Sequence, residues 1–192
     1  HLIEGSIQDV TERRKAVERL RFLAEHDPLT ELLNRRGIEQ VLEHALMGAN
    51  AGVTAAIAYV DLDRFKLVND LYGHAVGDEV LRQVTDRMTR VLRGHCAEPL
   101  ARVGGDEFVV VFEGVSLKRA KVVCEQLART ICDVPVAVGQ RLVRIEGSIG
   151  LCEVAPGVTV HEAIATADRA CRQAKQGQPG SLVVYEQAAG AY

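Results

Sequence analysis

The chain has 192 residues, of which 47% are hydrophobic and 26% are charged, and its formal net charge is −3. This composition is typical of a soluble globular domain with one sizeable core. The absence of basic blocks argues against nucleic acid as a partner, and no apolar run approaches the roughly 20 residues of a membrane span, so we expect no membrane contact by this fragment.

Residues 1–26 are mostly charged and rich in helix formers, which predicts a helix that extends from the rest of the chain. Apolar residues recur in it at a spacing of seven, with one more between the last two: Val10, Val17, Leu20 and Ala24. Arg13 interrupts this heptad seam. The pattern fits either a solvated linker helix or a short parallel coiled coil that joins two subunits. Because the chain opens on His1 without a signal peptide, we expect it to be a piece of a longer protein.

The stretch DPLT predicts a helix start, with Asp27 as the cap and Pro28 in the first turn. This helix is expected to continue to about Met47. Residues 53–63 are almost all apolar and rich in β-branched side chains, which predicts a strand buried on both faces.

Two helices, at 64–74 and 76–93, are predicted to follow this strand. Two strand-like stretches, LARV and EFVVVF, then flank a pair of glycines. The remaining elements are a helix with a Ser start at 116–132, strands at 134–138, 141–154 and 181–186, and a helix with a Thr start and a Gly stop at 159–177. This order predicts an α+β fold with a mainly antiparallel central sheet flanked by helices, preceded by an N-terminal extension helix.

The stretch RVGGDEF places two glycines and two acids between the two strands. Gly104 and Gly105 are expected at the tip of a tight hairpin of the primed type, which requires positive φ angles. Asp106 and Glu107 then stand at the mouth of the returning strand, where neighbouring carboxylates repel each other. This pattern alone favours a solvated surface hairpin and a cation site equally.

Asp61 lies at the end of the predicted buried strand. If this strand pairs beside the hairpin, Asp61, Asp106 and Glu107 converge. Three hard oxygen donors with open positions suit Mg²⁺, which keeps waters and takes substrate phosphates. Asp63 shares a face with Asp61 and is either a second metal ligand or the cap of the next helix, and we favour the cap.

Asn69 and Asp78 offer an amide and a carboxylate that match the edge of a guanine base. The amide supplies donors to O6 and N7, and the carboxylate accepts from N1–H and the 2-amino group. This spacing alone is more typical of two polar surface residues than of a base-binding site.

The five cysteines are odd in number and none has the CxxC spacing of a zinc site: Cys96, Cys124, Cys132, Cys152 and Cys171. We expect free thiols that pack as small hydrophobic side chains in a reducing compartment. They indicate a cytoplasmic location, whether or not the larger protein is attached to a membrane.

Five stretches, in this order, resemble the successive signatures of the GGDEF domain of diguanylate cyclases: DPLTELLNRR, DLDRFKLVNDLYGHAVGDEVL, RVGGDEF, GSIG and ADRACRQAK. The resemblance runs from about Asp27 to Tyr185 and implies a nucleotidyl-cyclase-like fold. The earlier stretch GSIQDVTERRKAVERL resembles the last strand of a PAS-type sensor domain and its outgoing signalling helix. The implied parts are the end of a sensor domain with a signalling helix at 1–26, the GGDEF catalytic domain at 27–187 and a C-terminal tail at 188–192.

Members of this family condense two GTP molecules into cyclic di-GMP and release two pyrophosphates, with one GTP held by each domain of a homodimer. The resemblance implies a site for Mg²⁺, with Mn²⁺ as an alternative, formed by Asp61, the backbone carbonyl of Leu62, Asp106 and Glu107. It implies catalytic roles for Asp106, Glu107 and the phosphate-facing Lys66, and does not decide which acid is the base. The implied contacts to GTP are Asn69, His74, Asp78, Gly104, Gly105 and Lys175, the last of which neutralises terminal phosphate charge.

Three departures from the family pattern bear on function. Glu31 stands where the family usually has Gly, and Pro179 stands where it usually has Arg. The second change removes a charge-assisted phosphate contact of a kind that contributes about 1.5–3 kcal/mol. The product-binding RxxD motif is replaced by HCAE, with His95 and Glu98 at its ends, so we expect no working product-inhibition site.

Two functions remain open at this stage. The first is an active diguanylate cyclase, dimeric and controlled by an upstream PAS-type sensor domain. The second is a degenerate GTP-binding regulatory module that controls an adjoining phosphodiesterase domain after Tyr192. The intact RVGGDEF stretch favours the enzyme, and Pro179 favours the regulator.

Overall fold

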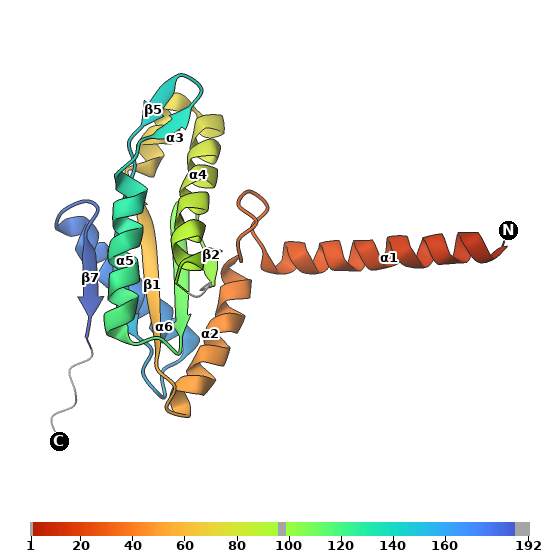
Figure 1. Ribbon diagram of the computed structural model, residues 1–192, viewed down its shortest axis with the longest axis horizontal. Helices are drawn as coiled ribbons and strands as arrows, with labels where there is room; N and C mark the ends of the chain where they lie inside the picture. The colour runs from red at the N-terminus through yellow and green to blue at the C-terminus, as the bar shows by residue number, and fades with distance from the viewer. Residues whose placement is uncertain (1, 96–98, 187–192) are drawn as a thin grey trace.

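The computed structural model of the chain describes residues 2–95 and 99–186 (Figure 1). Its centre is a five-stranded sheet in the order β2-β3-β1-β6-β7. The strands are β1 (Ala55–Asp63), β2 (Leu100–Arg102), β3 (Glu107–Glu113), β6 (Glu146–Glu153) and β7 (Leu182–Tyr185). Only the β6–β7 pair in this sheet is parallel. The predicted α+β fold with a mainly antiparallel sheet is therefore confirmed.

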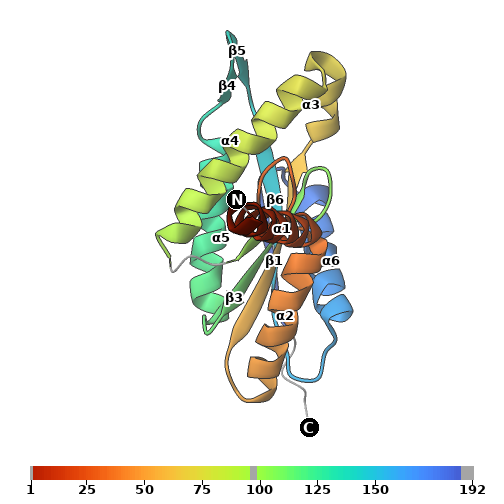
Figure 2. The same cartoon turned by 90° about the vertical axis from the view of Figure 1, so that its right-hand side faces the viewer.

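Helices cover both faces of the sheet (Figure 2). They are α4 (His74–Arg93) and α5 (Leu117–Cys132) on one face, and α2 (Arg35–Asn50) and α6 (Val160–Gln176) on the other. Alternate residues of β1 point to opposite faces, so Val60 packs with α4 and α5 while Ile57 packs with α2 and α6. Both are fully buried, as predicted for a strand covered on both sides.

A smaller layer closes one end of the molecule. It consists of α3 (Phe65–Tyr72) and a two-stranded ribbon of β4 (Val136–Val138) and β5 (Arg141–Val143). The single strand predicted at 141–154 is wrong in this respect, because β5 and β6 are separate strands in different sheets. The two helices predicted after the buried strand are confirmed as α3 and α4.

The helix predicted to start at Asp27 starts eight residues later, at Arg35. Asp27 caps a turn instead, because its carboxylate accepts hydrogen bonds from the Thr30 amide at 2.9 Å and the Thr30 hydroxyl at 2.7 Å. Asn34 is the true cap of α2, and its side chain accepts from the Gly37 amide at 3.0 Å.

Glu31 lies within this turn with a φ of 61°, in the left-handed region that favours glycine. The turn is closed by hydrogen bonds from the Glu31 amide to the Asp27 carbonyl and from the Asp27 amide to the Leu32 carbonyl, each 2.8 Å. The departure from glycine noted in the sequence therefore falls on a position where a side chain is strained.

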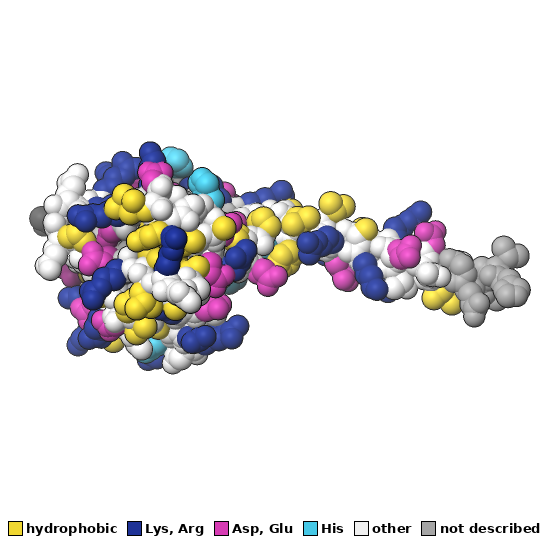
Figure 3. All heavy atoms as spheres, turned by 90° about the horizontal axis from the view of Figure 1, so that it is seen from above, with side chains coloured by type: hydrophobic (Ala, Val, Ile, Leu, Met, Phe, Trp, Pro, Cys, Tyr) yellow, Lys and Arg dark blue, Asp and Glu magenta, His cyan; other side chains and the backbone are white. Residues whose placement is uncertain are grey.

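The N-terminal helix α1 (Leu2–Glu25) extends away from the body of the domain (Figure 1). The strand expected early in this stretch is wrong, because one continuous helix occupies it. Asn34 anchors the end of α1: its amide donates to the Glu25 carbonyl at 2.8 Å and its side chain to the Ala24 carbonyl at 3.0 Å. Apolar side chains stand exposed along the helix in Figure 3, among them Ile7, Val10, Val17, Leu20 and Leu23.

Helix α6 lies directly on the backbone of β6 at Gly150. A Cβ atom at Gly150 would overlap the Cys171 amide nitrogen and the Ala167 carbonyl of α6. The helix begins with the predicted Thr start, as a full capping box between Thr159 and Glu162. This close approach sets the distance of α6 from the sheet and so the position of the lysine near its C-terminal end.

Within the described residues, no helix is long and apolar enough to cross a membrane.

Replacing Glu31 with glycine should raise the free energy of unfolding by about 0.5–1 kcal/mol, because relief of the left-handed strain exceeds the added entropy of the unfolded chain. Urea unfolding measures the difference. Gln40→Gly, in the regular backbone of α2, is the matched control and should lower stability by about 0.5–1 kcal/mol. A loss of stability in Glu31→Gly comparable to that of the control would contradict the assignment of strain.

Candidate active site

The candidate site forms where β1 ends beside the first residue of β3. Their antiparallel register places Asp61 directly opposite Glu107. The Leu62 amide donates a hydrogen bond to the Asp106 carbonyl at 3.0 Å, which holds the two chain segments together beyond the last pair. The condition on which the convergence of these acids depends, pairing of the Asp61 strand beside the hairpin, is therefore met.

The turn between β2 and β3 differs from the prediction. Neither Gly104 nor Gly105 takes a positive φ, so the primed hairpin turn is wrong. The turn is instead held by hydrogen bonds to the Glu107 carbonyl from the Val103 amide at 2.9 Å and the Gly104 amide at 3.4 Å. A Cβ at residue 104 would overlap the Glu107 carboxylate, so a side chain there would displace this acid. Gly105 is exposed and a Cβ there would meet no protein atom.

Arg102 clamps this turn. Its Nε and Nη2 atoms donate to the Gly105 carbonyl at 3.1 and 2.9 Å. Its Nη1 atom donates to both carboxylate oxygens of Asp27 at 3.1 Å, in a largely buried ion pair. Burial raises the pKa of Asp27, but hydrogen bonds from Thr30 and Arg102 outweigh it and hold that pKa below its usual value. Sequence reasoning missed this clamp because the partners are 75 positions apart.

Lys175, from the last turn of α6, reaches the carboxylates from the other side. Its Nζ atom lies 2.8 Å from Oδ1 of Asp61. This ion pair places the ammonium charge of Lys175 against the buried Oδ1 atom of Asp61. Burial raises the pKa of Asp61 to about 6, with Lys175 opposing the rise and the negative charges of Asp106 and Glu107 adding to it. The site therefore holds more negative charge than one lysine neutralises.

The carboxylate oxygens of the site fit a Mg²⁺ ion whose coordination is completed by waters and by the phosphates of a bound nucleotide. Among the described residues, no three His, Cys, Asp or Glu side chains are already grouped as metal ligands. Mg²⁺ is commonly held by one or two carboxylates together with waters and substrate phosphates. Asp61 offers a buried carboxylate oxygen beside Lys175, and Asp106 lies close enough to raise the pKa of Asp61.

Asp63 is not the cap of the next helix, which corrects the sequence prediction. The cap position of α3 is Arg64, with a φ of 58° and no side-chain hydrogen bond to the helix. The Asp63 carboxylate accepts from the Ser148 hydroxyl at 2.8 and 2.9 Å and from the Gly180 amide at 3.1 Å. Asp63 therefore joins β1, β6 and the loop after α6, and its oxygens are already engaged.

The predicted base-binding pair comes from two consecutive helices. Gly73, with a φ of 89°, reverses the chain between α3 and α4, and its amide donates to the Asn69 carbonyl at 2.9 Å. This reversal brings the half-buried Asn69 against the first turn of α4, which also carries the half-buried Asp78. Two other predicted contacts, Lys66 and His74, are exposed on the same helices.

Of the two residues at the ends of the expected degenerate product-binding motif, His95 and Glu98, the structure describes only His95. The His95 Nε2 atom lies 2.7 Å from Oε1 of Gln126, on α5. This hydrogen bond engages one of the two ring nitrogens of His95. Glu98 lies outside the described residues.

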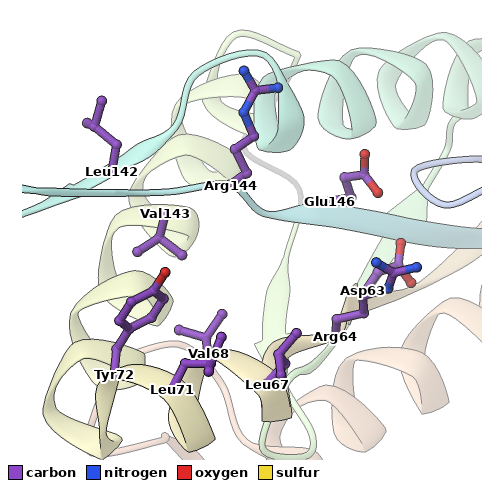
Figure 4. A pocket seen from close by; sticks show the side chains of 10 residues that line it. All are labelled: Asp63, Arg64, Leu67, Val68, Leu71, Tyr72, Leu142, Val143, Arg144 and Glu146. Atoms are coloured by element: carbon purple, nitrogen blue, oxygen red, sulfur yellow. The ribbon is translucent and has the colours of Figure 1, made fainter.

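A second hollow, which sequence reasoning did not find, adjoins the site at Asp63 (Figure 4). It has a volume of about 320 Å³ and lies between α3 and the β5–β6 segment. Its walls combine apolar and charged side chains from distant parts of the chain: Asp63, Arg64, Leu67, Val68, Leu71, Tyr72, Leu142, Val143, Arg144 and Glu146.

The family model described as "Diguanylate cyclase, GGDEF domain" matches residues 24–180. The probable diguanylate cyclase DgcE of Escherichia coli is 36% identical over 182 residues, which cover 94% of this chain and 16% of that protein. The bifunctional diguanylate cyclase/cyclic di-GMP phosphodiesterase MucR of Pseudomonas aeruginosa is 38% identical over 173 residues, which cover 88% of this chain and 25% of MucR. The chain thus spans a quarter or less of the length of these two relatives.

A crystal structure of the coiled coil and GGDEF domain of DgcB from Caulobacter crescentus, in complex with c-di-GMP, superposes with a TM-score of 0.86. It is 28% identical, and the match covers 95% of this chain and 97% of DgcB as crystallised. The likeness therefore includes α1 as well as the globular part.

Asp61→Asn should stabilise the protein near pH 7 when no metal is added. The folded pKa of about 6 exceeds the ordinary 3.8, so the folded state keeps a proton that the unfolded state releases between these values. Stability therefore falls as pH rises through that window, and a neutral amide removes the penalty, a gain of about 1–3 kcal/mol.

Urea unfolding near pH 7 and below pH 4 measures this effect, which should shrink at the lower pH. Asp86→Asn makes the same chemical change at an exposed position of α4 and should leave stability unchanged. A less stable Asp61→Asn protein near pH 7 would contradict the stated balance of charges.

Proposed function

Because the chain belongs to the GGDEF domain family of diguanylate cyclases, we propose that it condenses two GTP molecules into cyclic di-GMP and two pyrophosphates, as a dimer with Mg²⁺. The observation that carries this proposal is the β1–β3 register, which sets Asp61 opposite Glu107 with Lys175 2.8 Å from the Asp61 carboxylate. Acids at the ends of rigid strands, one of them paired with a lysine, suit the positioning and charge neutralisation of phosphoryl transfer.

The proposed reaction joins the 3′-hydroxyl of one GTP to the α-phosphorus of the other. The new O–P bond forms as the bond to the bridging oxygen breaks, and pyrophosphate leaves. The same exchange between the other 3′-hydroxyl and the other α-phosphorus closes the ring and releases the second pyrophosphate. A bound Mg²⁺ or Mn²⁺, held by Asp61, the Leu62 carbonyl and Asp106 with Glu107 adjacent, would supply neutralisation of phosphate charge.

The remaining steps fall to the chain's own side chains. Lys175 and Lys66 bind the phosphates and offset charge on the leaving pyrophosphate. One of the two hairpin acids, Asp106 or Glu107, receives the hydroxyl proton. The lack of a side chain at Gly105 leaves the exposed turn open to the nucleotide, next to both acids.

Guanine would be recognised between α3 and α4. The Asn69 amide donates to O6 and N7, and the Asp78 carboxylate accepts from N1–H and the 2-amino group. His74, at the start of α4, is placed to contact the same nucleotide.

A second candidate is a regulatory module that binds GTP and controls an adjoining phosphodiesterase domain. Pro179 favours it, because this exposed residue in the loop after α6 supplies no charge to a phosphate. The name of MucR shows that cyclase and phosphodiesterase activities occur together in a relative. Product formation from GTP separates the two candidates.

The proposed dimer forms through α1. Its exposed apolar residues follow the predicted seam and include Val10, Val17 and Leu20. Such a stripe is unfavourable in water and fits a second copy of the same helix. The crystallised DgcB fragment, described as a coiled coil and GGDEF domain, supports this arrangement. We further propose that a PAS-type sensor domain precedes α1.

Incubation with GTP and Mg²⁺, followed by chromatography, should show cyclic di-GMP from the unaltered chain and none from Asp106→Ala. The variant removes a proposed metal ligand from a half-buried turn and none of the core, so it should be at least as stable as the parent. Unchanged turnover in Asp106→Ala would refute the metal assignment. GTP binding without product in the parent would favour the regulatory module.

Val17→Asp should lower the specific activity in dilute solution, because it places a charge in the proposed seam between two chains. Gln8→Asp adds the same single negative charge on the side of α1 away from the seam and is the matched control. Sedimentation equilibrium and activity across a dilution series measure the effect. Equal dimerisation of both variants would argue against the seam.

Cyclic di-GMP should bind only weakly at the His95 position. Histidine lacks the bidentate fork of arginine, and its ring is already hydrogen-bonded to Gln126. Calorimetry of the unaltered chain and of a His95→Ala, Glu98→Ala double variant measures the affinity. Submicromolar binding that disappears in the double variant would overturn this expectation.

A further inference from the structure

The Asn69 side chain lies in a slot on α4 that exists only because residue 77 is glycine. Gly77 is buried in the first turns of this helix. A Cβ atom added there would overlap Oδ1 of Asn69. It would also lie 3.2 Å from Cζ of Phe65, so the slot has the amide on one side and an aromatic ring on the other.

The slot also sets which end of the amide faces outward. Oδ1 is the Asn69 atom that approaches Gly77 most closely, while Cγ stands 3.0 Å from the position of the added Cβ. A carbonyl oxygen beside a Cα–H group makes a weak favourable contact, whereas an NH₂ group there would leave its donors without acceptors. Nδ2 is therefore turned away from Gly77, and the end of the amide that faces away from α4 is a donor.

We propose that Gly77 is a specificity-determining positioning residue: by having no side chain, it seats the Asn69 amide with Oδ1 against α4 and presents Nδ2 to the base. This inference builds on the proposed recognition of GTP. A donor at this point suits the O6 acceptor of guanine and meets the 6-amino donor of adenine unfavourably. Asp78, the next residue, reads the other half of the same edge by accepting hydrogen bonds.

The two halves of this edge can be tested separately with modified nucleotides. 6-Thio-GTP keeps N1–H and the 2-amino group but has a poor acceptor at position 6, so it reports on Asn69. Inosine triphosphate keeps O6 and N1–H but lacks the 2-amino group, so it reports on Asp78. Their displacement of a fluorescent GTP analogue gives affinities without requiring turnover.

Gly77→Ala should weaken GTP about tenfold, the loss expected for one hydrogen bond, and should abolish the preference for GTP over 6-thio-GTP. The preference for GTP over inosine triphosphate should remain. Gly94→Ala adds the same methyl group at the other end of α4, 3.3 Å from the Val91 carbonyl, and should leave all affinities unchanged. Adding Gly77→Ala to Asn69→Ala should cause no further loss, because the amide through which Gly77 acts is already gone.

Additive losses in the double variant, or a Gly77→Ala protein that keeps its preference for GTP over 6-thio-GTP, would overturn the proposal. A chain that binds GTP with these preferences but forms no cyclic di-GMP would refute the cyclase function and still support the role of Gly77. If GTP does not displace the fluorescent analogue from the unaltered chain, both proposals are refuted.

Discussion

The antiparallel pairing of β1 with β3 is the constraint on which the site depends. It places Asp61 opposite Glu107 at the end of a strand whose other residues are almost all buried. A slip of one residue would turn the core side chains of β1 toward the wrong face, so the hydrophobic effect fixes the register. The same register brings together acids that repel each other, and burial with this repulsion raises the pKa of Asp61 to about 6. The stable pairing of the strands therefore keeps these acids close together, although their mutual repulsion is unfavourable when no cation is bound.

Two further contacts complete the site from outside this strand pair. Gly150 lets α6 lie close to the sheet, which brings Lys175 to Asp61. Arg102 fixes the hairpin turn and joins it to Asp27, just beyond the end of α1. The helix that we propose to join two chains is thus connected by hydrogen bonds to the turn that carries the acids.

The sequence predicts those parts of the fold whose signals are local and agree with one another. The apolar run of β1 and the Ser and Thr starts of α5 and α6 are confirmed. Each depends on periodicity or capping within a short window.

The errors arise where contacts distant in sequence compete with a local signal. Asp27 and Pro28 look like a helix start, but pairing of Leu33 with the sheet delays the helix until Asn34 can cap it. Asp63 looks like a cap, but hydrogen bonds from β6 and from the loop after α6 engage it. Gly104 looks like a residue with a positive φ, but its φ is not positive, and what it provides is room for the Glu107 carboxylate. No local sequence pattern predicts the contact of the Asn69 side chain with Gly77, because this contact depends on how α3 folds back on α4.

The most direct test of the account is a crystal structure with Mn²⁺ and α,β-methylene-GTP, which cannot lose pyrophosphate. The anomalous signal of the metal locates it independently of the protein atoms. The account predicts a peak in direct contact with the carboxylates of Asp61 and Asp106 and with the triphosphate, and displacement of Lys175 from Asp61 toward the phosphates. A nucleotide bound elsewhere, or bound at the hairpin without a metal at these acids, would contradict it.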